Sequence, residues 1–173
     1  MLRRTALLAA CLVFSSISLC GGQDSPLFFI PERTPAPAPA FLLPDLSGRT
    51  VSSKEFAGKV AVLSFGATYC DTCISELRSL EHLQAKFPKD VVVCFVALDG
   101  LGEKDVKPFM EKNGHRLATL LDPRMAVARE YGIHWIPVTV IVDRQGVVVG
   151  RAIGPRAWDG KEAVDLVRSL LKH

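Results

Sequence analysis

The sequence predicts an α/β domain with a mixed central sheet, parallel strands plus a C-terminal β-hairpin, and helices on both faces. Residues 60–65 and 91–98 are continuous apolar runs, as buried parallel strands require. Residues 72–87 between them have helical periodicity and predict the crossover helix that joins two parallel strands. Residues 138–142 and 147–152 are β-branched runs around a short turn, which predicts the hairpin.

The remaining elements follow in chain order. Residues 45–49 predict a turn between two short extended pieces. Further helices are predicted at residues 103–113, 123–131 and 158–172. The helices at 103–113 and 123–131 are each followed by a glycine, and Pro123 suits the first turn of the second of them. Apolar residues line one face of the helix at 158–172. The early crossovers and the late hairpin together imply a sheet that is parallel in part and antiparallel at one edge.

The composition is that of a globular protein and excludes one class of partner. The chain has 173 residues, of which 49% are hydrophobic and 23% charged, and its formal net charge is +3. This length suits one domain with an N-terminal extension. Because the net charge is small and no basic stripe with interleaved aromatics occurs, we expect no nucleic-acid partner.

Residues 1–20 predict a signal peptide. Arg3 and Arg4 form a short cationic start, and residues 7–19 carry no charge. This apolar run has the length of a signal-peptide core and is short for a membrane span. An uncleaved membrane anchor is the alternative. In either case the chain is expected to be exported, as a periplasmic protein or one anchored facing outside the cytoplasm.

Cys20 raises the possibility of a lipoprotein signal. A cysteine that ends an apolar signal and precedes Gly21 resembles a bacterial lipoprotein cleavage site, although Leu19 is larger than the residue preferred there. Lipidation of Cys20 is therefore a hypothesis, and the type of signal cleavage stays open.

Residues 21–40 predict a linker, and residues 41–173 the domain. Four prolines alternate with alanines in the second half of this linker. Such a run favours an extended, semi-rigid spacer, which would hold a domain away from a membrane. A disordered leader is the alternative.

The five cysteines divide into three groups. Cys11 and Cys20 belong to the signal region, Cys70 and Cys73 form a CxxC motif, and Cys94 lies within an apolar run. This is not the pattern of a structural disulfide framework, so we expect one functional pair and one small buried hydrophobic residue.

The position of the CxxC motif points to redox chemistry. Cys70 follows the first buried strand and starts the helix, where unpaired N–H groups and the helix dipole stabilise a thiolate. Cys73, one turn later, can attack the mixed disulfide that Cys70 forms. A zinc site lacks further ligands at suitable spacing, and a c-type haem site would need His where Ile74 stands. A structural disulfide remains possible. No metal and no cofactor beyond this disulfide is expected.

Residues 41–173 resemble the thioredoxin superfamily, specifically the TlpA-like and ResA-like bacterial thiol–disulfide oxidoreductases. The matching features are Phe41-x-Leu43-Pro44-Asp45 with Gly48, Cys70-Asp71-Thr72-Cys73, Asp122, Tyr131-Gly132-Ile133, Ile136-Pro137, and Asp143 with Gly146. They are spread over the whole domain and imply a thioredoxin-like fold.

The resemblance also implies roles for residues around the cysteines. Pro137 would follow a cis peptide bond after Ile136 and shape the groove in which a partner's backbone docks. Glu76 would sit near the cysteines and act as a proton acceptor or tune their acidity. The alternative is that Glu76 faces solvent. Tyr69, which precedes the motif, would contact the partner.

Two residues before the proline are further candidates. His134 and Trp135 are expected at the rim of the cysteine pair, where Trp135 would give apolar contact area and a protonated His134 would perturb the Cys70 thiolate. Simple packing roles are the alternative.

Three positions depart from the thioredoxin pattern. The aromatic before the first cysteine is Tyr69 instead of Trp. The buried acid of thioredoxin itself would fall at Ser64, and the proline of the active-site helix at Arg78. We therefore expect a straighter helix and a different proton acceptor.

The predicted function is disulfide exchange outside the cytoplasm with protein thiols and disulfides. The resemblance favours a reductase, for example in cytochrome c maturation, supplied by a membrane or periplasmic electron donor. The direction of electron flow stays open. Two alternatives are a peroxiredoxin-like peroxidase, although Thr68 is too close to Cys70 for its motif, and a copper-binding assembly factor, whose CxxxC spacing is one residue longer.

Overall fold

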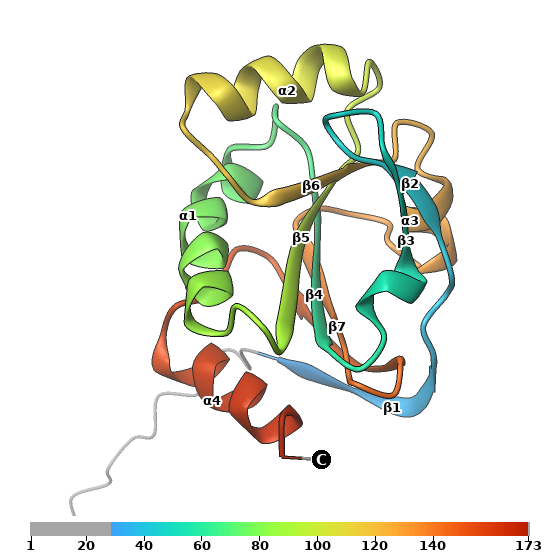
Figure 1. The fold of residues 1–173 in the computed structure, drawn as a ribbon, viewed down its shortest axis with the longest axis vertical. Helices are drawn as coiled ribbons and strands as arrows, with labels where there is room; N and C mark the ends of the chain where they lie inside the picture. Colours follow the sequence, from blue (N-terminus) through green and yellow to red (C-terminus); the bar gives the residue numbers. More distant parts are fainter. Residues whose placement is uncertain (1–28, 173) are drawn as a thin grey trace, which may run out of the picture.

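A computed structural model describes residues 29–172. Within them, six strands form one sheet in the order β1-β8-β7-β4-β5-β6 (Figure 1). The strands are β1 (Ile30–Pro37), β4 (Val60–Gly66), β5 (Val91–Ala97), β6 (Ala118–Leu121), β7 (Val138–Val142) and β8 (Val147–Ile153). β4, β5 and β6 run parallel, whereas β7 is antiparallel to β4 and β8 is antiparallel to both β7 and β1. The predicted mixed sheet with a C-terminal hairpin is confirmed.

Helices pack on both faces of the sheet, as predicted. One face is covered by α1 (Asp71–Lys86) and α4 (Lys161–Leu170), and α2 (Glu103–Lys112) adds to the same apolar core beside β6. Alternate residues of β4, such as Val60 and Val62, point into this core. The other face packs against α3 (Ala126–Glu130), the 3-10 helix η1 (Ser53–Phe56) and a hairpin of β2 (Leu42–Pro44) and β3 (Thr50–Ser52).

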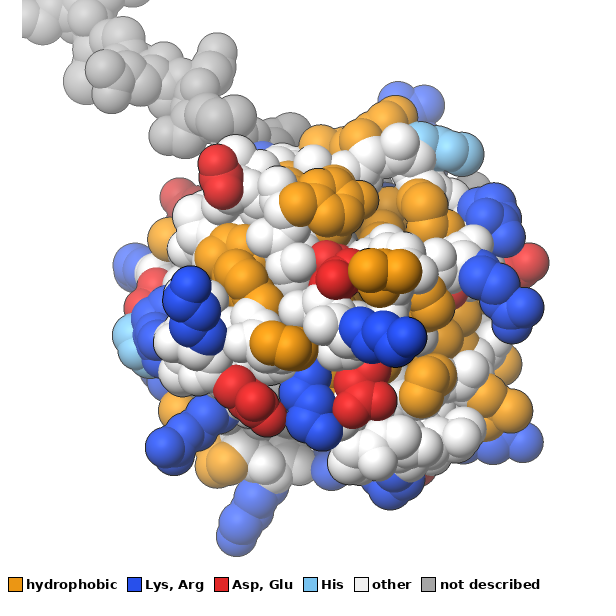
Figure 2. All heavy atoms as spheres, turned by 90° about the horizontal axis from the view of Figure 1, so that it is seen from above, with side chains coloured by type: hydrophobic (Ala, Val, Ile, Leu, Met, Phe, Trp, Pro, Cys, Tyr) orange, Lys and Arg blue, Asp and Glu red, His pale blue; other side chains and the backbone are white. Residues whose placement is uncertain are grey.

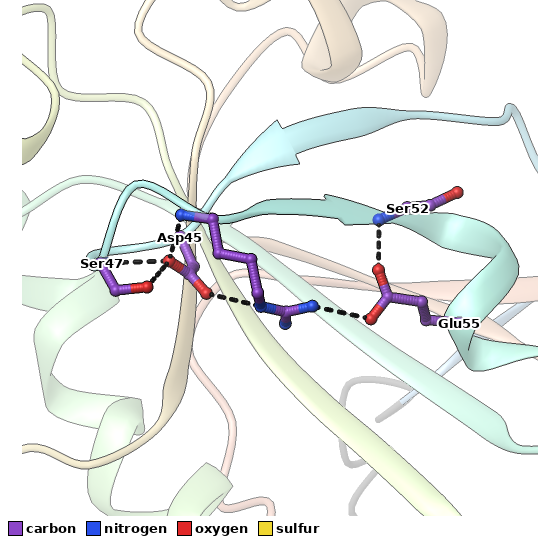
Figure 3. A network of polar contacts seen from close by, with 5 residues as sticks. Asp45, Ser47, Ser52 and Glu55 are labelled. Atoms are coloured by element: carbon purple, nitrogen blue, oxygen red, sulfur yellow. Dashed lines mark hydrogen bonds and ion pairs between the residues drawn. The ribbon is translucent and has the colours of Figure 1, made fainter.

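A polar network fastens the β2–β3 hairpin to η1 (Figure 3). Asp45 Oδ1 accepts hydrogen bonds from the backbone N–H of Ser47 at 2.8 Å and of Arg49 at 3.1 Å. Arg49 also donates to Glu55 at 3.0 Å, and Glu55 accepts from the backbone N–H of Ser52 at 2.8 Å. These side chains close the turn that was predicted at residues 45–49.

The predicted linker is wrong for residues 30–37, because these residues form the edge strand β1. Ile30 pairs with Arg151 and Pro37 with Val147 of β8, with a register shift between the two ends. Glu32 adds an ion pair with Arg151 at 3.3 Å. Proline is tolerated here because an edge strand has one side without ladder hydrogen bonds. The predicted signal peptide, Cys20 and the first part of the linker lie outside the described residues.

Strand β6 and helix α3 also differ from the prediction, and helix α4 begins at Lys161 and not at residue 158. Strand β6 was missed because it is only four residues long. Helix α3 begins at Ala126 and not at Pro123, because the Asp122 carboxylate accepts the N–H groups of Ala126 and Ala128, both at 2.8 Å. Asp122 thus supplies the acceptors that a helix start needs.

No helix within residues 29–172 is both long and apolar enough to cross a membrane.

Candidate active site at the start of helix α1

Cys70 lies where the chain leaves β4 and enters α1. It is the N-cap of the helix, and its Sγ accepts the backbone N–H of Cys73 at 3.2 Å. The Thr72 hydroxyl lies 3.4 Å from the same sulfur. Both contacts and the positive end of the helix dipole stabilise negative charge on this sulfur.

Cys73 is bonded to Cys70 in a disulfide, with 5.3 Å between the two Cα atoms. The side chain of Cys73 is fully buried, whereas Cys70 is partly exposed. A partner can therefore reach the sulfur of Cys70 far more readily than that of Cys73.

Gly66, the last residue of β4, makes room for Cys73. A Cβ atom built on Gly66 would lie 2.9 Å from the Cβ and 3.2 Å from the Sγ of Cys73, and 2.7 Å from the ring of Phe95. The close approach of strand and helix thus requires glycine at this position. Sequence reasoning gave Gly66 no role, since its requirement depends on a helix packed against it.

Glu76 lies one turn after Cys73 on the same face of α1 and is buried, with 2% of its surface exposed. Its carboxylate accepts three hydrogen bonds, from the Ser64 hydroxyl at 2.7 Å, the Trp158 indole N–H at 3.2 Å and the Arg156 backbone N–H at 3.2 Å. The solvent-facing alternative for Glu76 is therefore wrong.

The location of this buried acid explains the departure at Ser64. Ser64 and Gly66 point from β4 to the same side because side chains alternate along a strand. Gly66 lies under Cys73, and Ser64 contacts Glu76. The acid is thus supplied by the helix instead of the strand. Burial raises the pKa of Glu76, and the hydrogen bonds from Ser64, Trp158 and Arg156 partly oppose this shift.

Asp99 is a second buried acid near the motif and was missed by the sequence analysis. It follows β5 and is 1% exposed. Its carboxylate accepts the Thr68 backbone N–H at 3.1 Å and the Thr68 hydroxyl. Because Thr68 is two residues before Cys70, Asp99 holds the loop that carries the cysteine. An acid directly after a buried strand was the available signal.

The Ile136–Pro137 peptide bond is cis, in agreement with the expectation from the resemblance. Pro137 is buried at the start of β7. The next residue, Val138, pairs with Phe65 of β4, just before the loop that leads to Cys70. The register of the two strands therefore brings Pro137 to the same edge of the sheet as the cysteines.

The other predicted contact residues lie near this edge with different exposure. Tyr69, His134 and Trp135 are exposed, and Ile136 is partly exposed. The rings of His134 and Trp135 lie 6.1 Å apart. Arg78, at the position of the missing helix proline, is exposed on an uninterrupted α1 and forms an ion pair with Glu81 at 2.7 Å.

Cys94 is buried in the middle of β5 and forms no disulfide. Burial raises the pKa of its thiol to about 12. Such a thiol stays protonated and is a poor nucleophile, in agreement with the predicted packing role. Among residues 29–172, no group of three or more His, Cys, Asp or Glu side chains has the arrangement needed to hold a metal ion.

A dithiol that can open and close a disulfide at an accessible helix start is the working part of a thiol–disulfide oxidoreductase. This chain is an enzyme of that class, and its sheet, helices and cis-proline give it the thioredoxin-like fold. It belongs to the Redoxin family, whose sequence model matches residues 34–167.

Named relatives agree with this assignment. The chain is 32% identical over 127 residues to the thiol–disulfide oxidoreductase ResA of Bacillus thuringiensis (strain Al Hakam), and the match covers 72% of each chain. It is 30% identical over 119 residues to the thioredoxin-like protein YneN of Bacillus subtilis (strain 168), which covers 68% of this chain and 69% of YneN.

Solved structures show the same fold. A Chlorobium tepidum protein assigned as the thiol:disulfide interchange protein DsbE superimposes with a TM-score of 0.71 and 28% identity, covering 78% of this chain and 95% of that one. DsbF from MTB, solved in mixed oxidised and reduced forms, gives a TM-score of 0.65 and 28% identity, and the match covers 75% of this chain and 94% of DsbF.

Proposed function

We propose that the chain is an extracytoplasmic reductase of protein disulfides in which Cys70 attacks and Cys73 resolves. The observation that carries the proposal is the difference between the two sulfurs. Cys70 is accessible at the helix start and its Sγ accepts an N–H group, whereas Cys73 is fully buried beside it.

The reaction consists of two exchanges. The Cys70 thiolate attacks one sulfur of the partner's disulfide, so a mixed disulfide forms and the partner's other sulfur leaves as a thiolate that takes up a proton. Cys73 then loses its proton and attacks Cys70, which releases the partner's second sulfur as a thiolate that is also protonated. The partner gains two electrons and two protons, and Cys70 and Cys73 return to the disulfide.

Glu76 accepts the proton of Cys73 in this scheme. It lies one turn further on the same helix face and is buried. The raised pKa of Glu76 lies closer to that of a thiol than an ordinary carboxyl pKa does, which favours proton transfer between them.

Two acids close to the pair support the reducing direction. Asp71 follows Cys70 directly, and Glu76 lies beyond Cys73. Negative charge beside a thiolate disfavours the reduced, ionised form of the pair. This lowers the reduction potential and makes the dithiol a better reductant.

The partner's backbone binds along Pro137 and Ile136 in this proposal, and Tyr69, His134 and Trp135 border the same site. Support comes from the register of β7 against β4 and from the exposure of these side chains. Electrons are returned to the oxidised enzyme by a membrane or periplasmic donor. Cysteines of apocytochrome c are one substrate class that the ResA-like resemblance suggests.

The reduction potential of the Cys70–Cys73 pair tests the direction. We expect a value of about −220 mV or lower at neutral pH, measured by equilibration with glutathione or dithiothreitol. A value near −120 mV would assign the protein to the oxidants and overturn the reductase proposal.

Export through residues 1–20 is tested separately. A full-length fusion to alkaline phosphatase should be active in cells, because this reporter requires an oxidising compartment. Incorporation of labelled palmitate that a Cys20→Ser variant lacks would support lipidation at Cys20. An inactive fusion would contradict export, and label retained by Cys20→Ser would contradict lipidation there.

A further inference from the structure

Exposed apolar side chains are concentrated at one edge of the sheet. Seven large hydrophobic residues are well exposed within residues 29–172, and the strand directions and register place five of them at the edge that carries Cys70. These five are Tyr69, Leu101, Met125, Trp135 and Ile153. The other two, Ile30 and Leu42, lie on β1 and on the separate β2–β3 hairpin.

The topology explains why these residues lie at one edge of the sheet. Tyr69 follows β4, Leu101 follows β5, and the two strands are parallel neighbours. Trp135 precedes β7, which is antiparallel to β4, so it reaches the same edge. The β4–α1 and β5–α2 connections lie at the upper end of the molecule in Figure 1, and Figure 2 shows hydrophobic side chains spread over that end among charged ones.

The buried acid Asp99 ties two of the loops together. Its carboxylate accepts both the backbone N–H and the hydroxyl of Thr68. The ends of β4 and β5 are joined by a second contact, because the Leu98 N–H donates a hydrogen bond to the Gly66 carbonyl at 2.9 Å. We call the Asp99–Thr68 contact the loop clamp.

The loop clamp limits how far two exposed side chains can be from each other. Tyr69 is the residue after Thr68, and Leu101 is two residues after Asp99. Consecutive Cα atoms are about 3.8 Å apart. The Cα atom of Tyr69 therefore lies about 4 Å from that of Thr68, and the Cα atom of Leu101 lies within about 8 Å of that of Asp99. Tyr69 and Leu101 therefore lie on the two loops that the clamp joins, on the β5 side of Cys70, and we call these two exposed side chains the apolar wall.

We propose that Leu101 is a substrate-binding residue, held beside Tyr69 by the loop clamp, and that this wall selects partners with apolar residues next to the reacting cysteine. The proposal rests on the reductase function proposed above. A partner must bring its disulfide to Cys70, so the side chains flanking that disulfide contact the surface that surrounds Cys70. An extended or unfolded polypeptide offers such apolar flanks, whereas folded proteins bury most of theirs.

Leu42 provides a matched control for Leu101. The two leucines have nearly equal exposed fractions, 69% for Leu42 and 67% for Leu101, but Leu42 lies on the outer side of the β2–β3 hairpin. Replacing either by serine removes a similar apolar surface from the protein. Only the Leu101 change alters the wall beside Cys70.

The experiment compares two short peptides, each carrying one cysteine in a mixed disulfide with a chromogenic thiol. One has leucines flanking the cysteine and the other serines. For the reduced full-length enzyme we measure the ratio of kcat/KM for the apolar peptide to that for the serine peptide. We expect Leu101→Ser to lower this ratio about fivefold to tenfold, because part of a leucine contact is lost, and Leu42→Ser to preserve it.

The loop clamp is tested with Asp99. Asn at this position keeps the oxygen that accepts both groups of Thr68, whereas Ala removes it. Asp99→Ala should therefore lower the ratio of the two kcat/KM values toward that of Leu101→Ser. Asp99→Asn should keep this ratio close to the wild-type value. A general loss of folding would lower both rate constants and leave their ratio unchanged.

Three outcomes would overturn the inference. In the first, the wild-type enzyme reduces both peptides but Leu101→Ser leaves the ratio of kcat/KM values unchanged. This outcome would contradict the role of Leu101 and leave the reductase function intact. Another is a wild-type enzyme that reduces neither peptide, which removes the reductase function as well. The third is a wild-type dimer that Leu101→Ser dissociates, which would assign the wall to a second copy of this chain.

Discussion

The cysteines of the domain occupy two contrasting places in one sheet. Cys70 and Cys73 lie beyond the end of β4, at a helix start, with Thr72 beside one sulfur and a buried acid one turn past the other. Cys94 lies within the neighbouring strand β5, paired in register with Leu63 and Ala118. Hydrogen-bond donors and access make the first pair reactive, and apolar burial makes Cys94 inert.

The largest effect is expected from removal of the accessible sulfur. Cys70→Ala should reduce disulfide exchange at least about 1000-fold, because no other thiol in the domain is both accessible and stabilised as a thiolate. Insulin reduction or turnover of a chromogenic disulfide measures it. The matched change Cys94→Ala is the control, and residual activity above a few per cent in Cys70→Ala would contradict the assignment.

Replacement of the buried acid should have the next largest effect. Glu76→Gln keeps most of the size of the side chain but removes the proton acceptor, so we expect the resolving step to slow about tenfold at neutral pH. Stopped-flow decay of the mixed disulfide measures this step. Glu162→Gln, on the exposed face of α4, is the control.

Glu76 should also affect how stability depends on pH. Burial raises the pKa of Glu76 above its ordinary value of 4.5, so the folded protein holds this proton more tightly than the unfolded chain does. The associated stability is complete below pH 4.5 and is lost as the pH rises through the folded-state pKa. Urea unfolding should therefore show Glu76→Gln gaining stability relative to the wild type between about pH 4 and pH 8. A constant difference over this range would contradict the raised pKa.

A smaller effect is expected from the contact between β4 and α1. Gly66→Ala would place a methyl group 2.9 Å from the Cβ of Cys73, so either the strand or the helix must shift. We expect a loss of about 1–3 kcal/mol in the free energy of unfolding. Gly100→Ala is the control, because a Cβ there meets nothing within 4 Å. Equal losses for the two variants would show that the close approach is unimportant.

The smallest effect should come from Cys94. Because the pKa of its thiol is about 12 and the side chain is buried, iodoacetamide at pH 8 should modify Cys70 of the reduced, folded domain and leave Cys94 unmodified. Peptide mass spectrometry with and without denaturant measures the difference. Rapid labelling of Cys94 in the folded protein would contradict its burial.

These contrasts also show which features the sequence could predict. The strands β4 and β5 and the helix α1 were predictable because each has a long, strongly periodic or apolar pattern. The edge strand β1 was not, because Pro31, Pro35 and Pro37 are typical of linkers and only the neighbour β8 makes them a strand. Strand β6 is too short for its pattern to stand out.

The site could be predicted in the same uneven way. The CxxC motif and the cis bond at Pro137 were accessible from local sequence and family resemblance. The burial of Glu76 was not, because its three donors come from Ser64, Arg156 and Trp158, which lie 12 to 82 residues away. Asp99 was missed for the same reason, since Thr68 is 31 residues before it.

The order of attack by the two cysteines is tested most directly by trapping the mixed disulfide. Reduced Cys73→Ser protein, mixed with a peptide disulfide, should accumulate a covalent adduct on Cys70 that peptide mass spectrometry locates. Reduced Cys70→Ser protein should accumulate little adduct on Cys73, because that sulfur is fully buried. An adduct that forms faster on Cys73 than on Cys70 would contradict the proposed roles of the two sulfurs.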